Sequence, residues 1–214
     1  MRKKQLPLSY ARHFQENSSI YLFVTVLFLM GIIFGAIVVN SLTLDQKEDL
    51  YFYLNRFFGQ VKSGEVASSV EMFQQSFFHN VKYLGLIWIL GIAIIGLPVV
   101  LILLFLKGMV IGFTVGFLVN QMGLSGFALS FVSVMPQNIF LIPAFLILSA
   151  ASVAFSLKLV RQQFFKKAAE PISASFLRYS GTMIAMVCLV ACAATVEAYV
   201  SPTLMKSVMA LLNK

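Results

Sequence analysis

The sequence predicts an all-α polytopic membrane protein: a single membrane domain (1–214) with five transmembrane helices, the N-terminus inside and the C-terminus outside. Hydrophobic residues make up 59% of the 214 residues and charged residues only 11%, whereas soluble domains carry about 25% charged residues. From Tyr83 to Leu157, Lys107 is the only Asp, Glu, Lys, Arg or His. The basic residues gather at the ends of the apolar runs, where lipid headgroups meet them. The net charge of +8 therefore indicates a membrane surface and not nucleic acid.

The first predicted span covers residues 20–39. This run of uncharged residues is long enough to cross the apolar core of a bilayer, which takes about 20 residues in a helix. Residues 1–15 carry four basic residues and no acid, which places the N-terminus in the cytoplasm. No A-x-A-like cleavage site follows the span, so we expect an uncleaved anchor helix.

Residues 41–82 form the predicted outer loop, which is the only long polar connection in the chain. Apolar residues at helical spacing predict an amphipathic helix pair on the outer membrane face or packed on neighbouring spans. Ser63-Gly64 is the expected turn between the two helices. The apolar face of the second helix is equally compatible with simple packing and with docking of an extracytoplasmic partner. The residues of this hypothetical partner-binding face are Val66, Val70, Phe73 and Phe77.

The second and third predicted spans, residues 83–106 and 108–125, are separated at Lys107-Gly108. The single charge of the apolar block marks this position as a turn, because lysine is costly within a bilayer. Pro98 predicts a kink inside the second span, because proline removes a backbone donor and clashes one turn upstream.

Two stripes of glycine predict helix-packing faces, because small residues let membrane helices approach closely. Gly31 and Gly35 form a G-x-x-x-G pattern in the first span. Gly108, Gly112 and Gly116 recur along one side of the third span. The two stripes could pack against each other within one chain or across a homodimer, and the sequence leaves both arrangements open.

The fourth and fifth predicted spans cover residues 137–157 and 181–199. Between the third and fourth spans, the uncharged residues 120–138 are expected to form a short outer loop or a re-entrant segment. Glu197 closes the fifth span at its outer end, and residues 201–214 have the pattern of a short interfacial helix. This topology places ten of the 16 Lys and Arg residues on the cytoplasmic side, as the positive-inside rule requires.

The residues favour a protein that is not an enzyme, with no catalytic, cofactor-binding or metal-binding site. Residues 123–126 read G-x-S-G, as in intramembrane serine proteases, but such a serine needs a neighbouring base. The only histidines, His13 and His79, precede the spans in which that base would be expected. His79 also lacks a second ligand at metal-binding spacing. Cys188 and Cys192 share an apolar helix and are interpreted as packing residues.

A small-solute or lipid-like permease component is the alternative function. Transporters combine broken helices with ionisable groups near the middle of the bilayer. A possible broken segment around Gly116 to Asn138 meets the first requirement. The second is unmet in the predicted topology, which puts Lys107 at a turn and Glu197 near an interface. Gln137 and Asn138 could contact a substrate, although capping of a helix start is the favoured explanation.

Two stretches, Asn80–Gly112 and Met135–Ala144, resemble the stage II sporulation protein M family, and the resemblance extends over essentially the whole chain. The broad family has an N-G-x-x-x-G-like turn, in which Lys107 replaces the asparagine here. It also has a P-H-G-x-x-E-L-P-A-like helix start. The prolines of this second motif are present, while three positions have residues other than His, Gly and Glu, which favours a structural role. The residues of interest in these motifs are Asn80, Lys107, Pro136, Gln137, Asn138, Leu141 and Pro143.

The resemblance implies a non-enzymatic role in endospore engulfment. The expected protein is a multi-pass scaffold in the mother-cell membrane at the forespore septum, which anchors and localises peptidoglycan hydrolases. The partners that the resemblance implies are sporulation protein D, a lytic transglycosylase, and sporulation protein P, an amidase and endopeptidase.

Overall fold

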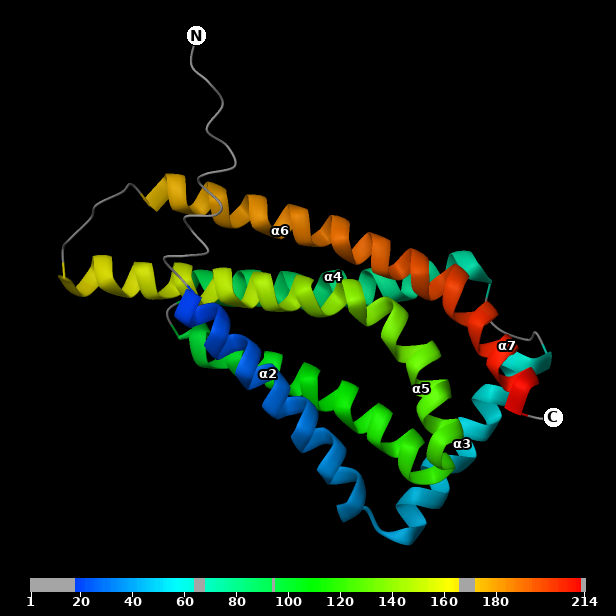
Figure 1. The fold of residues 1–214 in the computed structure, drawn as a ribbon. Coiled ribbons are helices and arrows are strands. Elements are labelled where there is room, and N and C mark those ends of the chain that lie inside the picture. Colours follow the sequence, from blue (N-terminus) through cyan, green and yellow to red (C-terminus); the bar gives the residue numbers. More distant parts are fainter. Residues whose placement is uncertain (1–17, 64–67, 94, 166–171, 213–214) are drawn as a thin grey trace.

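The structure, a computed structural model, describes residues 18–63, 68–93, 95–165 and 172–212. Every regular element in these ranges is helical, which confirms the all-α prediction (Figure 1). The elements in order are α2 (Ser18–Val38), the short 3-10 helix η1 (Val39–Ser41), α3 (Leu44–Ser63), α4 (Ser69–Ile92), α5 (Gly96–Phe165), α6 (Ile172–Thr195), the π-helical turn η2 (Val196–Val200) and α7 (Ser201–Leu212).

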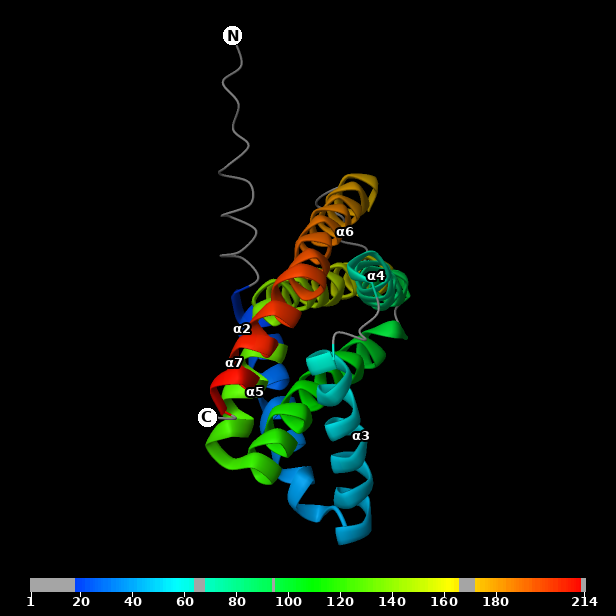
Figure 2. The ribbon, with the colours of Figure 1, turned by 90° about the vertical axis from the view of Figure 1, so that its right-hand side faces the viewer.

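The long helices run back and forth between two ends of the molecule (Figure 1). The start of α2, the α4–α5 turn and the end of α5 lie at one end, and α3 and α7 lie toward the other (Figures 1 and 2). Within the described residues, three stretches are long and apolar enough to cross a membrane: Ser18–Ser41, Gly96–Gln162 and Ile172–Val208.

Helices α3 and α4 both begin with local hydrogen bonds that the sequence encodes. Thr43 and Gln46 exchange side-chain and backbone hydrogen bonds at the start of α3, at 3.1 and 3.4 Å. Ser68 and Glu71 form a capping box at the start of α4, at 2.9 and 3.3 Å. These reciprocal bonds satisfy backbone donors that have no partner within a helix. They therefore fix where the predicted amphipathic helices start.

The turn between α4 and α5 lies between Ile92 and Gly96, so the prediction of a turn at Lys107-Gly108 was wrong. Helix α4 continues from the outer segment directly into the residues expected to begin the second span. Pro98 falls in the first turn of α5, where its missing N–H costs no helical hydrogen bond, and the predicted kink is absent there. Lys107 was misassigned because its charge was expected to need water, whereas a membrane helix can also turn a lysine toward polar partners inside the protein.

Helix α5 reverses direction at Gly123. This elbow divides the helix into a first arm (residues 96–122) and a second arm (residues 124–165). Gly123 has φ 57° and ψ −132°, a conformation open to glycine and strained for other residues. Residues 120–138, expected as a loop or re-entrant segment, are helical on both sides of this elbow. The second arm bends again after the elbow (Figure 1). It contains Pro136 and Pro143, each of which removes a helical N–H donor.

Helix α2 packs along the first arm of α5 through the two glycine stripes, which face each other within one chain. A Cβ atom added at Gly108 would lie 2.5 Å from the backbone oxygen of Phe28, and one at Gly35 would lie 2.8 Å from the carbonyl carbon of Met109. The helices are therefore in backbone contact at these glycines, as expected where small residues drive packing. No second chain is needed to cover the stripes.

Helices α4 and α6 and the second arm of α5 form the centre of the main core. The hydroxyl of Tyr179 in α6 donates to the backbone oxygen of Trp88 at 2.9 Å and lies 3.1 Å from Ser152 Oγ. Ser152 donates to the backbone oxygen of Ile87 at 3.0 Å. These buried hydrogen bonds tie three helices together, in the way polar side chains hold membrane helices.

A smaller apolar cluster packs α3 and α7 against the elbow of α5. Its buried residues come from α3, from both sides of Gly123 and from α7, and they are Phe58, Val61, Leu118, Leu129 and Met205.

Candidate functional site

A pocket of about 680 Å³ lies where α3, α4, both arms of α5 and η2 meet. It brings together residues that are more than 100 positions apart in the sequence. Apolar side chains such as Val110, Ile111 and Leu141 form part of its wall. The polar residues that define this polar pocket are Gln60, Gln75, Ser76, His79, Asn80, Lys107, Thr114, Gln137, Asn138 and Glu197.

Lys107 enters the polar pocket from the middle of the first arm. Its ammonium group donates a hydrogen bond to Asn80 Oδ1 at 3.3 Å. It also lies 5.3 Å from the ring centre of Tyr83 and 4.9 Å from that of Phe145. Aromatic faces attract a cation at such distances. The lysine thus exchanges water for one hydrogen bond and two ring contacts.

Glu197 enters the polar pocket from the π-helical turn η2. The N–H of Ser201 donates to the backbone oxygen of Val196, five residues back, and Pro202 follows without any N–H to donate. Such π turns within α-helices are rare and recur at functional sites. The Glu197 carboxylate accepts a hydrogen bond from Ser76. With its amide nitrogen turned toward the carboxylate, Gln137 donates to Glu197 Oε1 at 3.0 Å.

A chain of hydrogen bonds connects the two charged residues. Lys107 donates to Asn80, whose amide nitrogen lies 2.9 Å from the backbone oxygen of Ser76 and 3.5 Å from Ser76 Oγ. Ser76 in turn donates to Glu197. The opposite charges also attract each other across the pocket, and more strongly than they would in water because both side chains are partly removed from solvent. Helices α4, α5 and η2 are therefore joined by one polar network.

Most of the motif residues singled out in the sequence converge on this pocket. Asn80, Lys107, Gln137 and Asn138 all line it, and Pro136 and Pro143 lie within the second arm. Leu141 also lines it. The positions where this chain departs from the two broad motifs thus face one shared space.

Sequence reasoning missed the roles of Ser76 and Glu197. Glu197 was expected near an interface, and the permease alternative was given little support because ionisable groups within the spans seemed to be lacking. The structure brings Lys107 and Glu197 to the same pocket, so that argument was wrong. A signal was available, since Glu197 is the only acid in the sequence after Glu170, and acids within apolar segments usually face a functional interior.

The face proposed for partner binding is divided between solvent and core. Val70 is 58% exposed. Phe73 and Phe77 stack on each other with ring centres 5.7 Å apart, and Phe77 packs against the main core. Val66 lies outside the described residues. Among the described residues of this face, Val70 alone is fully accessible.

Two further features considered in the sequence were a protease-like motif and metal binding. The G-x-S-G motif, residues 123–126, forms the elbow of α5. In the part of the chain that the structure describes, no group of three His, Cys, Asp or Glu side chains is arranged to hold a metal ion.

Long apolar helices and charged side chains turned inward to a polar pocket define a helical membrane protein. The profile of one family, stage II sporulation protein M, matches residues 24–202. The chain belongs to this family, whose name links this membrane protein to sporulation. No curated protein and no solved structure matches it significantly.

Proposed function

We propose that this chain is a non-enzymatic membrane scaffold of endospore engulfment, which anchors the hydrolases D and P at the septal membrane of the mother cell. The observation that carries the proposal is the family match over residues 24–202. The hydrolases and the septal location come from the resemblance described above. In the proposed topology, α2, α4, the two arms of α5 and α6 are the five spans, with the N-terminus inside and α3 and α7 outside.

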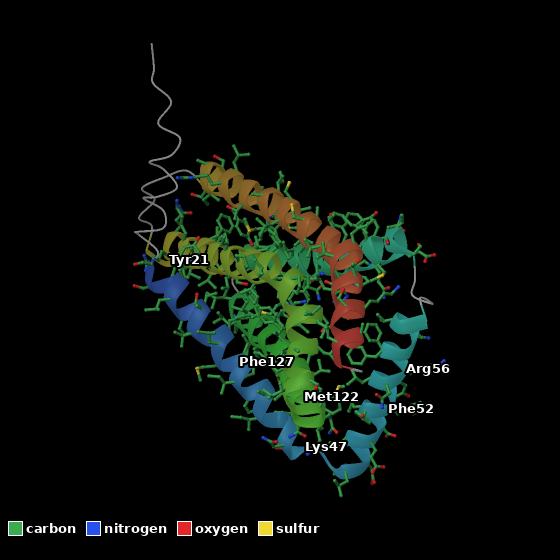
Figure 3. The ribbon with its side chains drawn as sticks, turned by 45° about the vertical axis from the view of Figure 1, so that its right-hand side comes forward. Tyr21, Lys47, Phe52, Arg56, Met122 and Phe127 are labelled. Carbon is green, nitrogen blue, oxygen red and sulfur yellow. The ribbon has the colours of Figure 1, made fainter. Side chains whose placement is uncertain are left out.

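The accessible outer surface of α3 and the start of α4 supports this proposal. Phe52 is 64% exposed and Tyr53 is 68% exposed. Phe52 and Arg56 lie on the outer side of α3 (Figure 3), while Phe58 and Val61 fasten the other side to the elbow. Exposed aromatic and arginine side chains are typical of protein interfaces. Together with Val70, this surface is the proposed hydrolase contact.

The scaffold proposal is tested by co-purification from membranes of sporulating cells that express the full chain with both hydrolases. The variant combines Phe52→Glu with Val70→Glu. We expect at least a tenfold loss of co-purified hydrolase, because two desolvated carboxylates would oppose docking. Membrane insertion and thermal stability should not change, because both side chains are exposed. Thr203→Glu, on the exposed side of α7, is the matched control.

Undiminished recovery of both hydrolases with the double variant would remove this contact surface from the proposal. Failure of the unmodified chain to recover either hydrolase would remove the scaffold function itself.

The polar pocket favours a second candidate function, a small-solute permease component. Half-buried charges beside a helix that contains prolines are features of transporter sites. The test is solute flux into proteoliposomes that contain only this chain, compared with the Glu197→Gln variant. Flux that the variant abolishes would support transport, and no flux above that of empty liposomes would remove this candidate.

A further inference from the structure

We infer that the polar pocket binds a small zwitterion, a molecule that carries one ammonium group and one anionic carboxylate or phosphate group. The inference deepens the second candidate function by naming a ligand class for the same pocket. It does not depend on hydrolase anchoring. It also concerns binding alone, so a ligand that binds without crossing the membrane satisfies it.

Lys107 can donate further hydrogen bonds in the polar pocket. An ammonium group has three N–H donors, and the hydrogen bond to Asn80 uses one of them. The neighbouring rings of Tyr83 and Phe145 stabilise the charge without neutralising it. An anionic oxygen group that enters the pocket can therefore take the remaining donors.

Glu197 can accept further hydrogen bonds in the polar pocket. An ionised carboxylate has about four lone-pair positions, and its partners in the pocket are Ser76 and Gln137, both uncharged. In the part of the chain that the structure describes, neither of these partners brings a cation into direct contact with the carboxylate. An ammonium group on a ligand would supply that cation.

Lys107 and Glu197 present their opposite charges at separate places in the polar pocket. Their connection runs through Asn80 and Ser76, so cation and anion stand at two ends of a polar link on α4. A simple anion drawn to Lys107 would be repelled by Glu197, and a simple cation drawn to Glu197 would be repelled by Lys107. A zwitterion offers the opposite charge to each residue, which favours it over ligands with one charge.

The polar pocket has the size of a small-molecule site and adjoins the protein surface. Its volume of about 680 Å³ lies within the range of about 300–1,000 Å³ typical of small-molecule sites. His79 is exposed and also lines a second, shallower pocket with Glu71, Gln74 and Lys82. Gln75 and His79, both exposed, line both pockets, so the polar pocket adjoins the surface on this side of α4. A free amino acid or the phosphoethanolamine headgroup of a lipid has the required charges.

The test measures binding to the purified full chain by calorimetric titration in a neutral detergent. The probes are L-alanine and glycerophosphoethanolamine. A third arm compares the melting temperature of the chain in nanodiscs of phosphatidylethanolamine and of phosphatidylglycerol. We expect saturable binding of at least one free probe, or a higher melting temperature in phosphatidylethanolamine. Binding of free probes alone identifies a soluble ligand, and the lipid effect alone identifies a headgroup.

Single-charge variants test the assignment to this pocket. Lys107→Asn and Glu197→Gln should each weaken binding at least tenfold, or abolish the lipid effect. Lys206→Asn on α7 and Glu48→Gln on α3 make the same changes at exposed positions and should leave binding unchanged. Because a single unpaired charge can destabilise the fold, a double variant, Lys107→Met with Glu197→Leu, removes both charges. We expect it to fold and not to bind.

The inference is overturned if neither free probe binds and the two lipids give the same melting temperature. It is also overturned if the folded double variant binds as tightly as the unmodified chain, or if acetate or ethylamine binds as tightly as L-alanine. Hydrolase co-purification is scored separately, so either proposal can fail while the other stands.

Discussion

The ammonium group of Lys107 donates a hydrogen bond to Asn80 Oδ1 at 3.3 Å, which ties the middle of the first arm of α5 to the middle of α4. A charge inside an apolar segment is thus satisfied by the protein and not by lipid headgroups. The helix boundary is set instead by backbone chemistry: α4 ends at Ile92, and Pro98 stands in the first turn of α5.

The contact between α2 and the first arm makes a prediction about glycine. Gly112→Ala would place a Cβ atom 2.7 Å from the carbonyl carbon of Ile32, which forces the helices apart. We expect a loss of about 1–3 kcal/mol in the free energy of unfolding, measured by denaturant titration in detergent micelles. Gly85→Ala in α4 is the control. It meets no atom within 4 Å and should stabilise the helix by up to about 1 kcal/mol. Equal effects of the two variants would contradict backbone contact at Gly112.

The buried hydroxyl of Tyr179 makes a second prediction. Tyr179→Phe removes its bonds with Trp88 and Ser152 and leaves the aromatic stack with Phe155, at 4.9 Å between ring centres, in place. We expect a loss of about 1 kcal/mol in the same unfolding assay. Tyr199→Phe, at an exposed position in η2, should have no measurable effect. A Tyr179→Phe protein as stable as the unmodified chain would show that this network does not hold α4, α5 and α6 together.

The proposed topology makes a third prediction, which cysteine labelling in protoplasts can check. Cys188→Ala and Cys192→Ala first remove the native thiols. In that background, an impermeant maleimide should label Leu44→Cys at the start of α3 from outside. Ile95→Cys, in the α4–α5 turn where Ile95 is 85% exposed, should react only after permeabilisation. Labelling of both positions from outside would contradict the five-span topology.

The same experiment separates the two possible turns. Lys107→Cys should react more slowly than Ile95→Cys after permeabilisation, because Lys107 is only partly exposed and lines a pocket between helices whereas Ile95 is 85% exposed. Fast labelling of Lys107→Cys together with slow labelling of Ile95→Cys would favour a turn at Lys107-Gly108 and contradict the fold described above.

Much of the fold could be predicted from the sequence because its signals are local. Capping residues such as Ser68 and Glu71 mark helix starts, and glycine stripes mark helix contacts. The α4–α5 turn could not be placed in this way. Lipid-facing helices lack the alternation of polar and apolar residues that marks boundaries in soluble proteins, so the single charge of Lys107 was given too much weight over the weaker signals of Gly96 and Pro98.

The pocket was harder to predict than the helices. Asn80, Gln137 and Asn138 were singled out as motif residues, but their shared location depends on the elbow at Gly123 and on the π turn that carries Glu197. Neither feature has a local pattern strong enough to fix its geometry. The network therefore joins side chains that sequence spacing alone does not relate.

The most direct test of the account is a double-mutant cycle between Lys107 and Glu197, since the account places both in one polar network. The free energy of unfolding is measured for the unmodified chain, Lys107→Met, Glu197→Gln and the double variant. We predict a coupling energy of about 1 kcal/mol or more, so that the double variant loses less stability than the two single losses combined. A parallel cycle that pairs Glu197→Gln with the exposed Lys206→Met should be additive. Additivity within about 0.5 kcal/mol for the Lys107 cycle as well would contradict a shared pocket.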